Sequence, residues 1–376
     1  MDGADQGVSL ETSITMFFKP TDRLAKVRDR LQKEQNLGQK PRTRLSVPRL
    51  AFRIFHVAIL VFGVIVVVGW YFLVGPSAHL HGSAYNHNQN AVWAQHAWVD
   101  QPHTPEEIRG FVENLGAHGV RYVFLHVGPL ESDGTIPSAR YKELGEFLRV
   151  SREYGDRLTF IPWLGQLRSK LPLQQLQVRK NIVHTTQIFV NDFGMKGVHY
   201  DIEPIVDGDT DFLFLLEDTR KALGSDALIS VALPEMVPDY VFSVARRFMD
   251  LKSFLSTDMY REVAARANQI TVMTYENSIK SAKVYEYFLK NEIIWITQLL
   301  ADQPVRILIG LPTYDKPTES FHPEAENIRA GLLGVIDGLN NWRSKKELFE
   351  GVALYGAWTT DASEWKTMET LFLKKP

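Results

Sequence analysis

The chain has 376 residues, a formal net charge of -2 and no cysteine. Its near-neutral charge argues against a nucleic-acid-binding protein, because such proteins are usually clearly basic. The absence of cysteine excludes disulfides, thiolate metal ligands and a cysteine nucleophile. The length fits one large domain or two ordinary ones, and a single α/β barrel needs about 250 residues.

One long apolar stretch covers residues 54–75, and only His56 within it can carry a charge. About 20 apolar residues span the hydrocarbon core of a membrane, and Trp70 and Tyr71 near the end suit the interface. We therefore predict one transmembrane helix. A cleaved signal peptide is the first alternative, but it would need a charged region of about 50 residues. A buried core helix is the second, although such an unbroken apolar run is unusual in a soluble fold.

The charges on either side of this stretch predict its orientation. After it, Asp100 is the first acidic or basic residue other than histidine. By the positive-inside rule, residues 1–53 form a mostly disordered cytoplasmic tail and the rest of the chain lies on the periplasmic or extracellular side. Residues 76–90 are polar and predict a linker. The basic residues that precede the stretch, with no acidic residue among them, are Lys40, Arg42, Arg44, Arg49 and Arg53.

From residue 91 to the end, short apolar runs alternate with helical patterns. Thr104, with Pro105 and Glu107 after it, is a typical helix start. Strand–helix alternation implies parallel strands with crossover helices, and eight units predict a closed (β/α)8 TIM barrel over residues 91–376. An open doubly wound sheet is the alternative, but no glycine-rich phosphate loop follows the first strand. The expected strands are 92–98, 121–127, 158–163, 197–203, 228–233, 270–275, 306–311 and 351–358.

The fourth expected strand, residues 197–203, carries alternating polar and apolar side chains. Alternation places His199, Asp201 and Glu203 on the face that points into the barrel, at the end where active sites of this fold form. Two neighbouring carboxylates disfavour each other's ionisation, so one of them should have a raised pKa and serve as a general acid. Pairing with basic residues inside the barrel is the structural alternative.

Other expected strand ends also carry aromatic and acidic residues. Aromatic faces stack on sugar rings and carboxylates bind hydroxyl groups, so this grouping favours a carbohydrate site, although a single barrel tryptophan more often packs in the core. The residues at these ends include Trp98, Trp163, Glu235, Tyr275, Glu276, Tyr314 and Trp358.

Taken in order, these motifs make the chain resemble glycoside hydrolase family 18, the chitinase-like family. The stretch Gly197-Val-His-Tyr-Asp-Ile-Glu203 is similar to the family's fourth-strand Asp-x-Asp-x-Glu. Met273-Thr-Tyr275 is similar to its sixth-strand Met-x-Tyr, and Gly310-Leu-Pro-Thr-Tyr314 to its seventh-strand Gly-Leu-Pro-x-Tyr. Trp358 stands where the family has an eighth-strand tryptophan.

The resemblance implies a retaining, substrate-assisted hydrolysis of polysaccharides that contain N-acetylglucosamine, in which the sugar's acetamido group is the nucleophile. It implies that Glu203 is the general acid and base, that Asp201 orients the acetamide and that Tyr275 binds the acetamide oxygen. It implies no metal and no organic cofactor. We predict further contacts with the oligosaccharide from Trp358, Tyr314, Glu276, His199, Glu235 and Trp98.

The sequence departs from the family pattern at three places. His199 replaces the first aspartate of the fourth-strand motif, Glu276 stands where many members have aspartate, and the third-strand Ser-x-Gly-Gly is absent. Two alternatives therefore stay open. The barrel could bind carbohydrate without cleaving it, as a lectin-like module. It could also hydrolyse sugars that lack an acetamido group, with Glu235 or Glu276 as the second carboxylate.

Overall fold

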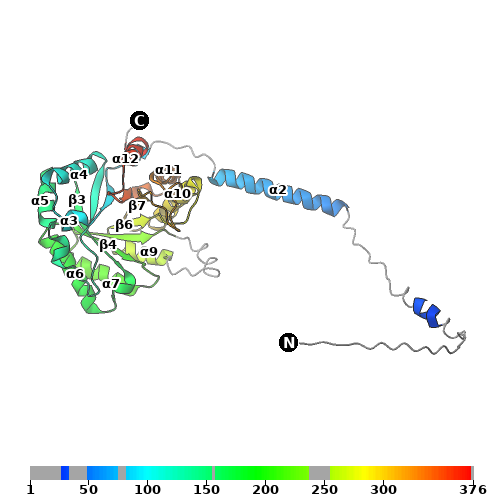
Figure 1. The fold of residues 1–376 in the computed structure, drawn as a ribbon, viewed down its shortest axis with the longest axis horizontal. Helices are drawn as coiled ribbons and strands as arrows, with labels where there is room; N and C mark the ends of the chain where they lie inside the picture. Colours follow the sequence, from blue (N-terminus) through cyan, green and yellow to red (C-terminus); the bar gives the residue numbers. More distant parts are fainter. Residues whose placement is uncertain (1–26, 34–48, 75–81, 155–156, 237–254, 374–376) are drawn as a thin grey trace, which may run out of the picture. The chain divides into compact units, whose positions relative to one another are not determined.

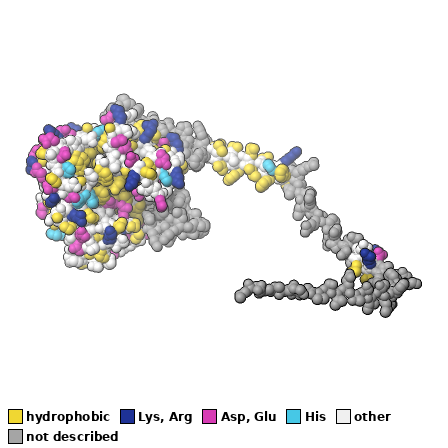
Figure 2. All heavy atoms as spheres, in the orientation of Figure 1, with side chains coloured by type: hydrophobic (Ala, Val, Ile, Leu, Met, Phe, Trp, Pro, Cys, Tyr) yellow, Lys and Arg dark blue, Asp and Glu magenta, His cyan; other side chains and the backbone are white. Residues whose placement is uncertain are grey.

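The computed structural model describes residues 27–33, 49–74, 82–154, 157–236 and 255–373 (Figure 1). The chain divides into two compact units, Met1–Gly69 and Trp70–Pro376. Most of the predicted cytoplasmic tail lies outside the described residues. Helix α2 (Arg49–Val74) has 26 residues, and between Ala51 and Gly69 most of its side chains are hydrophobic (Figure 2). Its segment Ala51–Gly69 has a mean hydropathy of 2.6, so it is long and apolar enough to cross a membrane.

The second unit is a closed barrel of eight parallel strands, which confirms the predicted (β/α)8 fold. Each strand pairs with its neighbours in the chain, and β8 closes the barrel against β1. The strands are β1 (Asn90–Ala94), β2 (Val120–His126), β3 (Thr159–Leu167), β4 (Gly197–Glu203), β5 (Leu228–Pro234), β6 (Gln269–Met273), β7 (Arg306–Pro312) and β8 (Phe349–Tyr355).

Helices lie around the strands in an outer layer (Figure 1). Thr104 begins α4 with the predicted capping box, in which its hydroxyl accepts from the Glu107 N–H and the Glu107 carboxylate accepts from the Thr104 N–H. The helices are α3 (Ala97–Asp100), α4 (Pro105–Ala117), α5 (Leu144–Tyr154), α6 (Leu176–Asn191), α7 (Thr210–Leu223), α9 (Thr257–Ala264), α10 (Ala282–Leu299), α11 (Ile328–Asn340) and α12 (Ala362–Met368).

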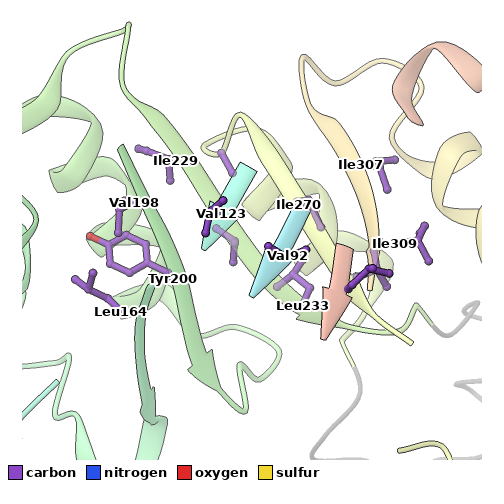
Figure 3. Close-up of a cluster of buried hydrophobic side chains, with 14 of the residues drawn as sticks. Val92, Val123, Leu164, Val198, Tyr200, Ile229, Leu233, Ile270, Ile307 and Ile309 are labelled. Carbon is purple, nitrogen blue, oxygen red and sulfur yellow. The ribbon is translucent and has the colours of Figure 1, made fainter. Parts of the chain in front are cut away.

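Two apolar clusters hold the barrel together because strand side chains alternate between its two faces. The larger cluster lies between strands and helices, and Figure 3 shows Val198 and Tyr200 of β4 within it. The Tyr200 hydroxyl is satisfied there by Thr186 and Thr219, at 3.2 and 2.8 Å. The smaller cluster fills the interior of the barrel and consists of Ala91, Trp93, Phe124, Ile161, Leu308 and Ala353.

Glycine is required where β4 begins. Gly197 has a φ of 150°, and a Cβ placed there would lie 1.9 Å from the carbonyl oxygen of Leu228 on β5. No other residue tolerates that approach without a shift of the backbone. This contact fixes the start of β4, and with it which side chains of the strand point inward.

The start of the domain differs from the prediction in two ways. The first strand ends at Ala94, and residues 97–100 form the short helix α3 instead of continuing the strand to Trp98. In addition, residues 82–84 of the predicted linker form the turn η1 (Gly82–Ala84), whose first two residues are buried. A Cβ on Gly82 would lie 2.6 Å from Phe372, so this turn packs closely on the end of the barrel domain.

Candidate active site

The inward face of β4 carries the residues that the alternation predicted. The outward side chains Val198, Tyr200 and Ile202 are fully buried. On the opposite face, His199 is fully buried, Asp201 is partly exposed and Glu203 is exposed. The strand therefore leads from the barrel interior to its open, carboxyl-terminal mouth, where two carboxylates stand on successive inward positions.

A cavity of about 250 Å³ lies at this mouth. It collects side chains from the ends of four strands, β4, β5, β6 and β8, or from the residues that follow them. This is the end of a (β/α)8 barrel at which active sites form. The lining residues are Asp201, Glu203, Pro234, Glu235, Met273, Tyr275, Glu276 and Tyr355.

Asp201 combines one fixed hydrogen bond with an unpaired oxygen. The indole N–H of Trp163 on β3 donates to Oδ2 of Asp201 at 2.8 Å. The other oxygen, Oδ1, is buried and has no hydrogen-bond partner among the described residues. Burial raises the pKa of Asp201 well above its ordinary value, and the negative charge of Glu203 raises it further. The carboxylate pair is thus built to retain a proton.

Three tyrosines from β6, β7 and β8 form the aromatic side of the site. Tyr275 stacks on Tyr355 with ring centroids 5.3 Å apart, and Tyr314 meets both rings edge-on at 6.4 and 6.0 Å. The Tyr314 hydroxyl donates to Glu276 at 3.3 Å. Burial, with the charges of Asp201 and Glu203 among the other causes, raises the pKa of Tyr275 well above its ordinary value and that of Tyr355 to about 12. Both phenols are therefore neutral hydrogen-bond donors at neutral pH.

The loop after β6 holds Glu276 in an uncommon backbone conformation. Its φ is 64°, in the left-handed region, which is costly for a residue other than glycine. The carboxylate of Glu326 supports the loop, because it accepts the N–H groups of Asn277 and Ile279 at 3.2 and 2.8 Å. The strained position therefore orients the Glu276 side chain into the cavity beside Tyr275.

Two further carboxylates lie at the end of β5. Glu235 lines the cavity, and burial raises its pKa to about 7, with a smaller contribution from the charge of Glu326. Glu292 on α10 lies behind it and accepts the N–H of Met236 at 2.8 Å. Burial raises the pKa of Glu292 to about 8. Close to pH 7, each of the two can hold a proton.

His199 does not line the cavity. The indole N–H of Trp93 donates to its Nε2 at 3.1 Å, and its Nδ1 lies 2.9 Å from the Ser230 hydroxyl. Its ring stacks on Phe124 with centroids 3.8 Å apart. Since Nε2 accepts, the neutral ring carries its proton on Nδ1, and burial lowers the pKa of His199 to about 3. The histidine is a neutral part of the barrel interior.

The hydrogen bonds of His199 continue toward the opposite end of the barrel. Ser230 donates to Gln269 at 2.8 Å, and Gln269 donates to Glu350 at 2.7 Å. Glu350 also accepts from the Tyr122 hydroxyl at 2.8 Å. We call this series, from Trp93 through His199 to Glu350 and Tyr122, the interior network. The groups of this network thus satisfy one another, whereas the hydroxyl of Thr271, buried on the same face of β6 as Gln269, has no partner among the described residues.

The two remaining predicted tryptophans differ in position. Trp358 follows β8, is 41% exposed and meets Tyr355 edge-on at 5.5 Å, so it stands beside the cavity. Trp98 belongs to α3 and stacks on Phe111 of α4 at 4.4 Å. Its indole packs against the helix layer and is not part of the cavity lining. The reason is local: the chain turns into a helix after Ala94, which carries Trp98 away from the mouth.

Sequence reasoning missed the role of residues that reach the site only through strand closure. Tyr355 lines the cavity and contacts Tyr275, although the pattern drew attention to Trp358, three positions later. Trp163 was noted as an aromatic residue, but its hydrogen bond to Asp201 depends on the pairing of β3 with β4. Among the described residues, no group of three histidine or acidic side chains is arranged to hold a metal.

Fold and site together define a (β/α)8 barrel with an acidic, tyrosine-lined cavity at its mouth. No protein-family model matches the chain, and no curated protein matches its sequence. Solved structures match its fold. The spore cortex-lytic enzyme SleL of Bacillus megaterium has a TM-score of 0.53 and 15% identity, over 79% of this chain and 76% of that one.

Chitinases share the fold as well. The chitinase of Chromobacterium violaceum has a TM-score of 0.51 and 12% identity, over 76% of this chain and 99% of that one. The Group IV chitinase of Ostrinia furnacalis has a TM-score of 0.51 and 12% identity, over 76% of this chain and 100% of that one. At such low identity the likeness establishes the barrel fold, and function must be argued from the site.

Proposed function

We propose that the protein is a membrane-anchored glycoside hydrolase that cleaves polysaccharides containing N-acetylglucosamine by a retaining, substrate-assisted mechanism. The observation that carries this proposal is the pair Asp201 and Glu203 at one cavity, with a neutral tyrosine, Tyr275, beside it. The pair retains a proton because burial and mutual repulsion disfavour two negative charges. The structural neighbours named as chitinases and as a cortex-lytic enzyme support the same class.

The first step joins the acetamide oxygen of the substrate to its anomeric carbon. Glu203 gives its proton to the leaving glycosidic oxygen as the bond from carbon to that oxygen breaks. Asp201 accepts the acetamide N–H and stabilises the positive charge of the cyclic intermediate. Trp163 contributes by holding Oδ2 of Asp201 with its indole N–H. The Tyr275 hydroxyl donates to the acetamide oxygen.

The second step returns the enzyme to its starting state. Glu203 takes a proton from water, whose oxygen attacks the anomeric carbon while the bond to the acetamide oxygen breaks. Two inversions at that carbon retain its configuration. Trp358, exposed beside Tyr355, offers a face for a sugar ring, and Tyr314 and Glu276 offer hydroxyl contacts.

One observation favours a second mechanism on the same barrel. Glu235 follows β5, the neighbour of β4, and lines the same cavity, and its pKa of about 7 suits a general acid or base at neutral pH. In a two-carboxylate reaction Glu203 and Glu235 would divide the roles of acid and nucleophile or base. Substrates would then need no acetamido group.

Membrane attachment would place the barrel on the outer side. Helix α2 is long and apolar enough to span a bilayer, and the basic residues before it favour a cytoplasmic N-terminus. Polysaccharide of the cell envelope is then the substrate within reach.

The test is hydrolysis by the full chain in detergent, with matched chromogenic glycosides that carry or lack an acetamido group. We expect cleavage only of the acetamido substrates. Cleavage of acetamido-free sugars would assign the reaction to the two-carboxylate mechanism. Saturable binding of chitin oligosaccharides without turnover of those oligosaccharides would instead indicate a lectin-like barrel.

A further inference from the structure

One tryptophan of the barrel domain is almost fully exposed. Trp342 is 88% exposed, whereas Leu167 and Leu176, the next most exposed large hydrophobic residues described in this domain, reach 51%. A single exposed apolar side chain is common on protein surfaces and needs no partner by itself. Its surroundings decide whether it has one.

The loop that carries Trp342 is fixed by hydrogen bonds on both sides of it. The Asn341 side chain accepts the N–H of Arg343 at 3.0 Å, and the Ser344 hydroxyl donates to Gly338 at 2.6 Å. The N–H of Lys345 donates to the hydroxyl of Thr297 on α10 at 3.1 Å. The indole is therefore held outward by an ordered loop, and its exposure does not come from a loose chain.

Three basic residues follow this indole closely in the chain. Arg343, Lys345 and Lys346 are exposed, and none forms an ion pair with a residue that the structure describes. Glu347 is the one acidic residue between positions 341 and 348. The ammonium group of Lys346 lies 5.5 Å from the ring centre of Tyr85. Exposed aromatic rings among lysines and arginines are typical of surfaces that contact the headgroup region of a membrane.

The loop lies at the end of the barrel opposite the cavity. It joins α11 to β8 and so precedes the strand, while the cavity collects the residues at strand carboxyl ends. Its neighbour Tyr85, whose hydroxyl donates to Asn340 at 2.5 Å, follows the turn η1 at the start of the barrel domain.

That start is also where the chain arrives from the candidate membrane span. Seven residues, 75–81, separate the end of α2 from Gly82. Fully extended, they reach at most about 30 Å. This length limits the distance between Gly82 and the end of α2, and Trp342 lies at the same end of the barrel as Gly82.

We propose that Trp342, with Arg343, Lys345 and Lys346, binds the anionic headgroup region of the membrane that α2 spans. The inference rests on the proposed membrane anchor. It gives the barrel an orientation, in which the amino-terminal ends of the strands contact the lipid and the cavity opens away from it. The enzyme then takes its polymer from the space beyond the membrane surface, and the membrane-proximal end serves only for docking.

The absence of cysteine allows a direct test, because any introduced cysteine is the only labelling site. The full chain with Trp342→Cys carries an aromatic, environment-sensitive NBD label in vesicles of phosphatidylcholine, with or without phosphatidylglycerol. We expect a blue-shifted emission and loss of quenching by aqueous iodide in the phosphatidylglycerol vesicles. Adding Lys345→Glu and Lys346→Glu should restore the quenching.

Two further labels separate the possible failures. A label at Phe214→Cys, on the side of the barrel, should stay accessible to iodide, and one at Val64→Cys in α2 should be protected. A protected Val64 label beside an accessible Trp342 label would overturn the docking while leaving the anchor intact. An accessible Val64 label would refute the anchor itself, and with it the docking. Protection of the Trp342 label that follows protein density and not lipid charge would indicate contact between copies, and would also overturn the proposal.

Discussion

The interior network and the mouth of the barrel differ in whether their buried polar groups have hydrogen-bond partners. In the interior network, each donor from Trp93 to Tyr122 has its acceptor, and the only carboxylate, Glu350, receives two hydrogen bonds. At the mouth, Asp201 and Glu292 each keep a buried oxygen without a partner among the described residues.

The same difference separates two residues of β4, one that stabilises the barrel and one that we propose takes part in catalysis. His199 and Asp201 are two positions apart on the same face of β4. The histidine is neutral and fully satisfied, whereas the aspartate has a raised pKa and an unpaired oxygen. A buried polar group that is satisfied stabilises the fold, and one that is left unpaired in a cavity is available to a substrate.

The largest expected effect is on catalysis. Glu203→Gln should lower kcat on an acetamido substrate by about 10²–10⁴-fold, because the amide cannot transfer a proton. The melting temperature should hardly change, since Glu203 is exposed. Glu235→Gln is the matched variant, and substrate-assisted hydrolysis predicts a much smaller loss for it. Equal losses in the two variants would instead support the two-carboxylate reaction.

The second prediction concerns stability against pH. Burial raises the pKa of Glu292 from its ordinary 4.5 to about 8 in the folded protein, so its contribution to stability is complete below pH 4.5 and is lost progressively as the pH rises from 4.5 to 8. Glu292→Gln cannot ionise and keeps an acceptor for the Met236 N–H. At pH 9 it should be more stable than the parent by about 3–5 kcal/mol.

The measurement is denaturant unfolding of both proteins at pH 4 and pH 9. At pH 4 the two should nearly coincide, because the parent glutamate is then largely protonated in the folded and in the unfolded state. A constant difference at both pH values would show that packing, and not ionisation, separates them.

The third prediction breaks the interior network at its centre. Ser230→Ala leaves the Nδ1 proton of His199 without an acceptor and the Gln269 carbonyl without its donor. We expect a loss of about 2–4 kcal/mol in the free energy of unfolding, with kcat of the folded protein unchanged.

Ser151→Ala is its control, because Ser151 is equally buried but its hydroxyl has no partner among the described residues. That variant should be neutral or slightly stabilising. If the two serine variants lost the same stability, hydrogen bonding in the network would not be the cause.

The sequence alone could predict the barrel and the carboxylate pair because both depend on short-range patterns. The alternation in β4 separates Asp201 and Glu203 from the apolar face, and the strand–helix order implies parallel closure. The sequence pattern of one strand does not predict how deep a residue lies inside the barrel, because that depth depends on the side chains of other strands. His199 shares the face of Asp201, yet Trp93 and Phe124 surround it.

The residues that sequence reasoning misplaced have the same explanation. Trp98 continues an apolar pattern, but a four-residue helix turns it onto Phe111. The contact of Tyr355 with Tyr275 joins β8 to the end of β6, 80 positions apart in the chain. Contacts of this kind follow from barrel closure and leave no local signal in the sequence.

The smallest expected effect concerns the protonation of the carboxylate pair Asp201 and Glu203. Trp163→Phe removes the N–H that Asp201 accepts, and that hydrogen bond lowers the pKa of Asp201. Without it the pKa rises further, so the carboxylate pair keeps its proton to higher pH. In a plot of kcat against pH, the decline on the alkaline side should therefore move to higher pH. The value of kcat at the optimal pH should fall about tenfold, as expected for one lost hydrogen bond to a charged group. Trp358→Phe, which changes a ring beside the cavity but leaves Asp201 its donor, should raise KM without moving that decline. If the decline moved equally in both variants, aromatic packing at the mouth, and not the Trp163 hydrogen bond, would control the protonation of the pair.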